Sequence, residues 1–219
     1  CPKGPDHEWR AASGKRTGGG TGCPFCRNLK VSVTNSLARL FPDIAAEWHP
    51  TKNYPKVPSE VVAGSNKKYW WSCPKGSDHN WQASCDSRTG KRKRGCPYCR
   101  GLRVAETNSL ANCYPAIAAE WHPSRNGKLT PKDVVAGSDK KVWWVCLEGP
   151  DHEWAAKIDH RTRVGSGCPY CRGLKVSLNN SLAAKYPELA LEWHPTKNGT
   201  LTPADIVCGT RRKVWWKCA

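Results

Sequence analysis

Two kinds of short hydrophobic segment recur along the chain, and both predict β-strands. Residues 67–73 and 140–146 are aromatic and β-branched runs that each end on a cysteine. In residues 9–14, 81–86 and 154–159, a Trp, an Ala and a third small or apolar residue alternate with a second, mostly polar set. A period of two with one apolar face is typical of a half-buried strand. We therefore predict that each aromatic run forms a strand and that each alternating segment returns as a second strand.

Between these segments the apolar residues change to a helical spacing. Residues 110–121 show this spacing after an Asn-Ser pair that suits a helix N-cap. Pro115 interrupts the pattern, so we expect a short turn and then a helix that begins near this proline and ends at His122. Residues 130–133 read Thr-Pro-Lys-Asp, which predicts a capped helical turn. The first copy of this segment has Val57 in place of the Thr, and we expect a less regular loop there.

The whole pattern repeats. Cys1, Cys73, Cys146 and Cys218 open the same phrase at intervals of 72 or 73 residues. It reads Cys-x5-His-x-Trp, Arg-Thr, Gly-Cys-Pro-x-Cys-Arg, Asn-Ser-Leu-Ala, Glu-Trp-His-Pro and a basic pair before Trp-Trp. A fixed period of this length indicates a tandem array of small units. We divide the chain into residues 1–66 (without an N-terminal strand), 67–139, 140–211 and the start of a fourth unit at 212–219, and expect it to be part of a longer array.

Units of about 70 residues with few aliphatic side chains need a staple to hold a core. The mean hydropathy is −0.67, and the chain has no Met, 13 Cys and 12 Trp, which fall as four Trp per repeat period counted from Cys1, Cys73 and Cys146. A secreted disulfide scaffold is the alternative use of so many cysteines. A Cys-Pro-x-Cys knuckle with a His in fixed register in every unit favours zinc instead. We predict three Zn²⁺ ions, one per complete unit.

Three cysteines and one histidine per unit complete a closed zinc tetrahedron, which leaves no open position for catalysis. The predicted ligands are Cys1, His7, Cys23 and Cys26; Cys73, His79, Cys96 and Cys99; and Cys146, His152, Cys168 and Cys171. The second histidine of each unit, in Glu-Trp-His-Pro, competes for this role (His49, His122, His194). Its alternative role is a packing or polar contact at a helix end. Residues that occur in only one unit are expected to be ordinary side chains (His160, Cys85, Cys113, Cys208).

Taken together, these motifs resemble a probable zinc-ribbon/treble-clef family found in tandem copies in bacterial, viral and eukaryotic proteins. The resemblance covers essentially the whole chain, and the family's ligands match the set given above. It implies small α+β zinc-stabilised units, each with a β-hairpin, a Cys-Pro-x-Cys knuckle and short helices. The second histidine is often Asp in the family, which argues against it as a ligand. Members are often attached to nuclease-like domains, so the resemblance implies nucleic-acid binding and an effector domain outside this chain.

Charge supports a polyanionic partner. The chain carries 35 basic and 18 acidic side chains, a formal charge of +17, and three zinc-thiolate sites would leave about +14. The basic positions that recur suit phosphate contacts: Arg16, Arg88 and Arg161; Arg27, Arg100 and Arg172; Lys30, Arg103 and Lys175; and the pairs Lys67-Lys68, Lys140-Lys141 and Arg212-Lys213. For the first three, bracing of the fold against the acid of Glu-Trp-His is an equal alternative.

Residues that recognise DNA sequence should differ between units, whereas the residues that build the fold should stay the same. The polar face of the return strand varies in this way and supplies Arg10, Gln82 and Lys157, side chains that can read base edges. Residues 32–34, 105–107 and 177–179 vary too. Drift at exposed positions would give the same variation. The tryptophans could stack on unpaired bases, but packing is the favoured role, with one of each Trp pair in the core and the other against the neighbouring unit.

The resulting prediction is a non-enzymatic, zinc-binding array that binds duplex DNA inside the cell. A scaffold that binds protein or RNA is the alternative. The recurring acids show no partner carboxylate that would suit acid–base catalysis. No apolar run is long enough to span a membrane, and no signal peptide is visible.

Overall fold

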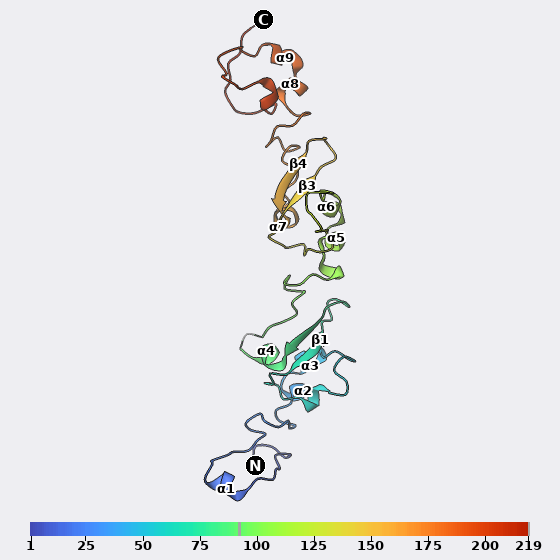
Figure 1. Ribbon diagram of the computed structural model, residues 1–219, viewed down its shortest axis with the longest axis vertical. Coiled ribbons are helices and arrows are strands. Elements are labelled where there is room, and N and C mark those ends of the chain that lie inside the picture. The colour runs from blue at the N-terminus through green and yellow to red at the C-terminus, as the bar shows by residue number, and fades with distance from the viewer. Residues whose placement is uncertain (92, 219) are drawn as a thin grey trace. The chain divides into compact units, whose positions relative to one another are not determined.

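The computed structural model describes residues 1–91 and 93–218. By its contacts the chain divides into two compact units, Cys1–Thr107 and Asn108–Ala219, whose bounds differ from those of the sequence repeats. In this section, the first and second units are these two compact units. Figure 1 labels the main elements of both units. No helix in the described residues is long and apolar enough to cross a membrane.

A two-stranded antiparallel hairpin is the centre of the first unit. Trp71 lies opposite Trp81 in this hairpin, and Trp48 forms a single bridge to the other edge of Trp71. The elements are α1 (Ser13–Thr17), α2 (Leu37–Leu40), α3 (Pro42–Ala46), the 3-10 turn η1 (Pro58–Glu60), β1 (Lys68–Ser72), β2 (Asn80–Ser84) and α4 (Cys85–Thr89). A further 3-10 turn, η2 (Glu106–Asn108), lies at the junction between the units.

The second unit repeats this arrangement. Trp144 lies opposite Trp154, and Trp121 bridges to Trp144. Its elements are α5 (Leu110–Cys113), α6 (Pro115–Ala119), β3 (Lys141–Val145), β4 (Glu153–Lys157), α7 (Ile158–Thr162), α8 (Leu182–Lys185), α9 (Pro187–Leu191) and η3 (Pro203–Asp205).

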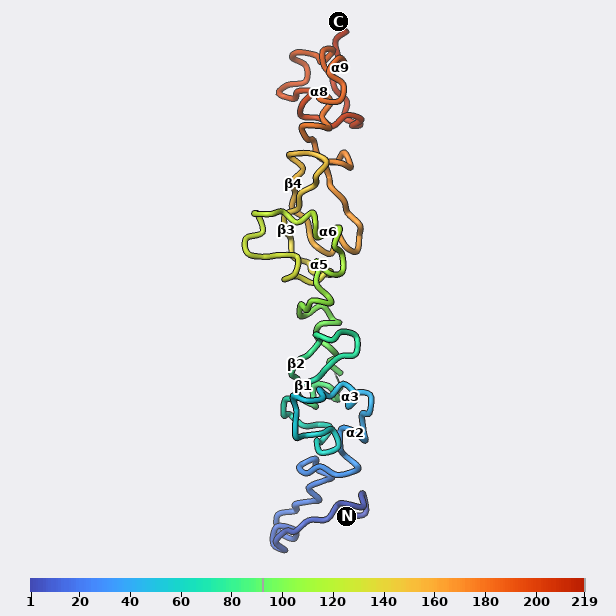
Figure 2. The backbone as a smooth tube through the Cα atoms, turned by 90° about the vertical axis from the view of Figure 1, so that its right-hand side faces the viewer, coloured from blue at the N-terminus to red at the C-terminus, as the bar shows by residue number. Residues whose placement is uncertain are grey.

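Each hairpin packs against the helix pair that precedes it in the chain. Both views of the first unit place α2 and α3 beside the β1–β2 hairpin (Figure 1, Figure 2). The buried cluster there contains Leu37, Val61, Trp71, Cys73, Trp81, Cys85 and Cys96, and its counterpart contains Leu110, Val134, Val142, Trp144, Trp154, Ile158 and Cys168. The core therefore joins the helices that follow one Cys-Pro-x-Cys knuckle to the hairpin that leads into the next. The repeat boundaries at 66/67 and 139/140 cut through these packed bodies and remain a prediction from the period.

The first two Trp pairs divide as the strand geometry predicts, whereas Trp215 and Trp216 are both exposed, so the prediction of one core tryptophan per pair is wrong for the third pair. Trp71 and Trp144 are fully buried. Trp70 and Trp143 face a cation from the preceding turn instead, with Lys52 Nζ 4.4 Å and the Arg125 guanidinium 4.6 Å from the ring centroids. These second tryptophans thus have a contact within their own packed body.

The helix starts follow the predicted chemistry. Ser36, Ser109 and Ser181 cap the short helices α2, α5 and α8 through their side chains, and a proline opens the next helix each time. The predicted break at Pro115 is confirmed, but α6 ends at Ala119, before His122. The cap is confirmed at Thr130, where backbone N and Oγ1 both donate to Asp133, but residues 131–134 form a turn and a bend instead of a helical turn.

Three local predictions were wrong. The return strands stop early because Cys85 and Ile158 begin the short helices α4 and α7. Residues 9–14 form no described strand, and Ser13 begins α1 instead. Alternation alone does not make a strand there, since no described segment pairs with it. The loop near Val57 still forms a regular 3-10 turn, because Pro58 presets its first position.

Candidate metal centres and basic surface

Three clusters of three cysteines and one histidine are the main candidate site. The potential ligand atoms of each cluster all lie within 4.8 Å of one another. The clusters are Cys1, His7, Cys23 and Cys26; Cys73, His79, Cys96 and Cys99; and Cys146, His152, Cys168 and Cys171. These are the predicted ligand sets, now brought together in space.

The spacing of these atoms fits a zinc tetrahedron. Bonds of about 2.3 Å to sulfur and about 2.0–2.1 Å to nitrogen place neighbouring ligand atoms roughly 3.5–3.8 Å apart. In the second cluster, Cys73 Sγ lies 3.6 Å from Cys99 Sγ, and His79 Nδ1 lies 3.6 Å from Cys99 Sγ. The first and third clusters repeat these separations at 3.6–3.7 Å. Each cluster can therefore hold one zinc ion.

The electrostatics of the thiols also suit a cation. Burial, and then the neighbouring thiols, raise the pKa of Cys99 and of Cys171 to about 12. Three thiolates this close would repel one another strongly. Zn²⁺ removes this penalty because a coordinated thiol is deprotonated by the metal's own charge.

The ligand histidines are oriented by hydrogen bonds on their far side. Nδ1 faces the sulfurs, and His79 Nε2 lies 3.0 Å from Thr107 Oγ1, which in turn donates to Asp78 Oδ1 at 2.7 Å. In the third cluster His152 Nε2 lies 3.0 Å from Asn179 Oδ1, a group that can only accept. These contacts place the proton on Nε2 and leave the Nδ1 lone pair for the metal. In the first cluster Ser32 and Thr34 take this position.

Two further features hold the histidine ring, and neither was predicted from the sequence. The aromatic residue inside each Cys-Pro-x-Cys knuckle stacks on the ring, with His79 and Tyr98 centroids 5.0 Å apart at 11°. A glycine of the motif Cys-x-x-Gly also lies against the ring: a Cβ on Gly76 would lie 2.9 Å from the His79 ring. The equivalent contacts are His7 with Phe25 and Gly4, and His152 with Tyr170 and Gly149. The recurrence of an aromatic residue and a glycine at these positions was the available signal.

The second histidine of each unit has the structural role. His122 Nδ1 accepts from the backbone N–H groups of Ser124 and Arg125, at 3.2 Å each. His49 and His194 cap their turns in the same way. None of the three belongs to a metal cluster in the described residues. Cys85 is likewise a core residue, since it is fully buried, and its counterpart in the next unit is Ile158.

Two of the proposed phosphate contacts are buried instead. Arg88 and Arg161 are 3 % and 5 % exposed and lie 2.7 Å from Glu47 and Glu120 respectively. Their guanidinium groups also lie over the core tryptophans, at 4.7 Å from the Trp144 ring centroid for Arg161. They brace the fold, which was the alternative role, and we remove them from the candidate nucleic-acid surface. Arg16 differs because it is exposed and donates to Thr21 O.

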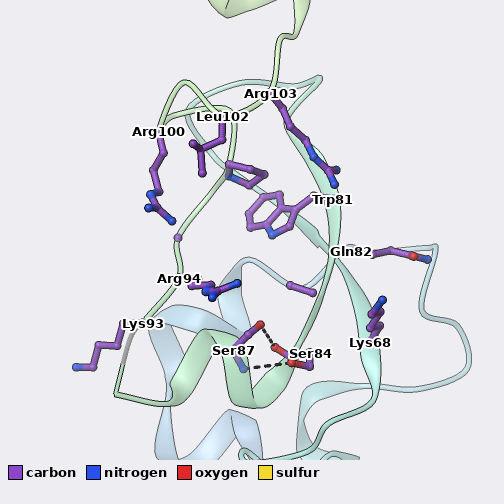
Figure 3. A pocket seen from close by; sticks show the side chains of 13 residues that line it. Lys68, Trp81, Gln82, Ser84, Ser87, Lys93, Arg94, Arg100, Leu102 and Arg103 are labelled. Atoms are coloured by element: carbon purple, nitrogen blue, oxygen red, sulfur yellow. Dashed lines mark hydrogen bonds between the residues drawn. The ribbon is translucent and has the colours of Figure 1, made fainter.

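The other basic candidates are exposed. Five cations gather around one hollow formed within residues 68–103 (Figure 3), and no acidic side chain is among its described lining residues. Its rim includes Arg100, Arg103 and Lys68, and Trp81 lies in the middle of the view. The hollow thus brings together predicted phosphate contacts from after the knuckle (Arg100, Arg103) and from before Trp-Trp (Lys68). Lys93 and Arg94 also line it. A second hollow, formed within residues 125–175, is lined by side chains of both charges, because Asp151 and Glu153 lie among its cations.

Among the proposed base readers, Arg10, Gln82 and Lys157 are exposed, and Gln82 lines the same hollow. The structure brings Gln82 to the basic rim but identifies no base contact, so readout of sequence remains a hypothesis.

The fold and the clusters define a tandem array of small zinc-binding modules. A comparison with protein families agrees. The model described as a probable treble clef zinc finger domain matches residues 44–102, 117–174 and 189–219, and the chain belongs to this family. The first two matched regions contain complete ligand sets, whereas the cluster of Cys1 precedes the first match. A search of curated proteins found no match.

Proposed function

We propose that the chain is a non-enzymatic array that binds nucleic acid, with duplex DNA as the favoured ligand. The observation that carries this proposal is the cation-lined hollow within residues 68–103, which contains Arg100 and Arg103 beside the knuckle. Because zinc would fix the knuckle, these cations would reach a phosphate backbone with little loss of freedom. The net charge of +17 adds long-range attraction. An intracellular location, where thiols stay reduced, is part of the proposal.

The recurrence of the exposed arginine after each knuckle also supports this reading. Arg27, Arg100 and Arg172 occupy the same position in three units and are all exposed. Cations that recur every 72 or 73 residues of a repeating chain suit a ligand with repeating charges. Duplex DNA carries one phosphate charge per about 1.7 Å of its axis and is such a ligand.

The first test combines zinc content with binding to random-sequence duplex DNA across a salt series. We expect three zinc ions per chain and an affinity that falls steeply as salt rises. The variant R27A/R100A/R172A should lower the slope of log K against log salt by about 2–3, since each phosphate contact contributes about one. The control K128A/K132A/K185A removes the same charge at exposed positions away from the knuckles and should change the slope little.

Equal effects of the two triple variants would mean that charge alone drives binding. Three zinc ions without duplex binding would overturn the proposal and favour the second candidate, a scaffold that binds protein or RNA. The mixed charge of the hollow around Asp151 is the observation that favours this second candidate.

A further inference from the structure

A leucine stands exposed on the turn that follows each zinc knuckle. Leu29, Leu102 and Leu174 are 69 %, 65 % and 68 % exposed. Each has an exposed arginine two residues before it and an exposed lysine or arginine directly after it. One exposed leucine needs no explanation. An exposed leucine between two cations in three successive units indicates a role outside the fold.

The turn that carries this leucine is fixed to the knuckle. The backbone N–H of Leu102 donates to Pro97 O at 2.9 Å, and Leu29 and Leu174 make the same bond at 2.8 Å. The preceding residue is left-handed each time, with φ of 56° at Asn28, 67° at Gly101 and 65° at Gly173. This backbone explains the Gly or Asn at the position.

The far end of the turn is held as well. Asn35 Nδ2 donates to Lys30 O and Asn180 Nδ2 donates to Lys175 O, both at 2.9 Å. Leu29 and Leu174 therefore sit on preformed turns whose two ends are tied to the body of the unit, and the turn of Leu102 has the same bond to its knuckle. A side chain placed in this way can be inserted into a ligand without ordering a loop first.

We propose that these leucines are apolar wedges that enter the minor groove of duplex DNA at a base step, while the flanking cations hold the phosphates on either side. This inference rests on the proposed function and names the feature of DNA that the array recognises. Figure 3 shows Leu102 between Arg100 and Arg103 at one end of the basic hollow. Leucine is one of the side chains that proteins use to unstack a base step and bend the duplex, and cations beside it suit the charge of the groove walls.

The proposal predicts which sequences are preferred. Pyrimidine–purine steps such as TpA unstack most easily, whereas A-tracts are stiff. Sites that contain TpA steps should therefore bind more tightly than A-tracts of the same length and A·T content. The preference would come from deformation of the DNA and not from hydrogen bonds to bases.

The test uses the full chain and a 30-base-pair duplex with central TpA steps, dyes at its ends and 2-aminopurine beside one step. We expect wild-type protein to shorten the end-to-end distance and to raise 2-aminopurine fluorescence. L29A/L102A/L174A should keep three zinc ions and the salt slope, bind roughly ten-fold more weakly and lose both signals. The matched control L147A/L191A removes leucines that are 98 % and 84 % exposed away from these turns, and should behave as wild type.

The outcomes separate the two levels of the proposal. Wild-type protein that binds the duplex with a steep salt slope but neither bends nor unstacks it overturns the wedge and leaves the proposed function intact. The same holds if the triple leucine variant retains full binding and bending, and the leucines would then belong to a protein-docking surface. Absence of any duplex binding by wild type overturns the proposed function, and the wedge fails with it.

Discussion

Replacement of the buried Arg161 tests whether this residue braces the fold or contacts DNA. Its guanidinium lies 2.7 Å from Glu120 Oε2 and over the rings of Trp144 and Trp154, at 4.7 Å and 5.2 Å from their centroids. The arginine side chain is 4 % exposed, whereas the glutamate side chain is 35 % exposed. The change R161A should therefore remove an ion pair and two ring contacts from one packed body without touching the zinc ligands.

The cost can be worked from these contacts. Removing one partner of a buried ion pair costs about 3–5 kcal/mol. Glu120 stays partly hydrated, which lowers this figure, and each lost ring contact adds about 0.5–2 kcal/mol. We expect a net loss of about 2–4 kcal/mol in the local stability of the β3–β4 hairpin, because these terms overlap.

Hydrogen exchange of zinc-loaded protein measures this loss directly. Amides of β3 and β4 should exchange roughly 30- to 1,000-fold faster in R161A, given about 1.4 kcal/mol per factor of ten. Amides of β1 and β2 serve as an internal reference and should not change, since their hairpin has its own pair of Arg88 and Glu47. The control R16A removes the exposed equivalent, which lies 5.1 Å over the Trp9 ring, and should cost less than about 1 kcal/mol.

The same variants separate bracing from DNA contact. At a temperature where R161A is fully folded, its affinity for duplex DNA should equal that of wild type, because a buried guanidinium cannot reach a phosphate. The reasoning is refuted if R161A loses DNA affinity as R172A does while the exchange of β3 and β4 stays unchanged.

Three further predictions concern single contacts. G149A places a Cβ 2.6 Å from the His152 ring and should weaken zinc binding at that cluster about 10- to 100-fold in a zinc-competition titration. The control G137A adds a Cβ that would meet no other atom, and its zinc affinity should match that of wild type. N126A removes the two hydrogen bonds with Trp143, from Trp143 N at 2.8 Å and to Trp143 O at 2.9 Å, and a longer one to His122 O at 3.5 Å. It should lower the unfolding free energy by about 2 kcal/mol in zinc-saturated denaturant melts, and an unchanged midpoint would contradict this. Burial, and then the charge of Lys52, lower the pKa of His49. A lowered histidine pKa contributes stability that is complete above the unfolded pKa near 6.5 and is lost as the pH falls below that value. An NMR titration should therefore show that His49 is protonated at a lower pH than the same histidine in an unfolded peptide.

The metal clusters could be predicted from sequence because their signal is local and repeated. Cys96 and Cys99 are separated by two residues in a knuckle, and Cys73 follows directly on β1. His79 comes back to the metal across a short turn. Each step depends on neighbours in the chain, so spacing alone constrains the geometry.

The remaining features depend on contacts that a local pattern does not contain. Arg88 meets Glu47 across 41 residues of chain, so the sequence could offer bracing only as an alternative. Cys85 and Ile158 continue the alternation of the strand before them, and nothing in that alternation marks the start of a five-residue helix. Residues 9–14 carry the same alternation, yet without a described partner strand the pattern forms no hairpin.

The structure gives the repeated residues two different explanations. Many have a contact inside the unit: Asn53, Asn126 and Asn198 bond the backbone of Trp70, Trp143 and Trp215. The glycine of Cys-x-x-Gly makes room for the zinc-site histidine. Arg88 and Arg161 form ion pairs with the partly buried Glu47 and Glu120. These residues repeat because the fold repeats. The exposed arginine and leucine after each knuckle do not share that explanation, since their side chains face solvent in all three units. Under the proposed function, these surface residues recur because each unit meets the same nucleic-acid partner, whose negative charge the cations around Leu102 would complement.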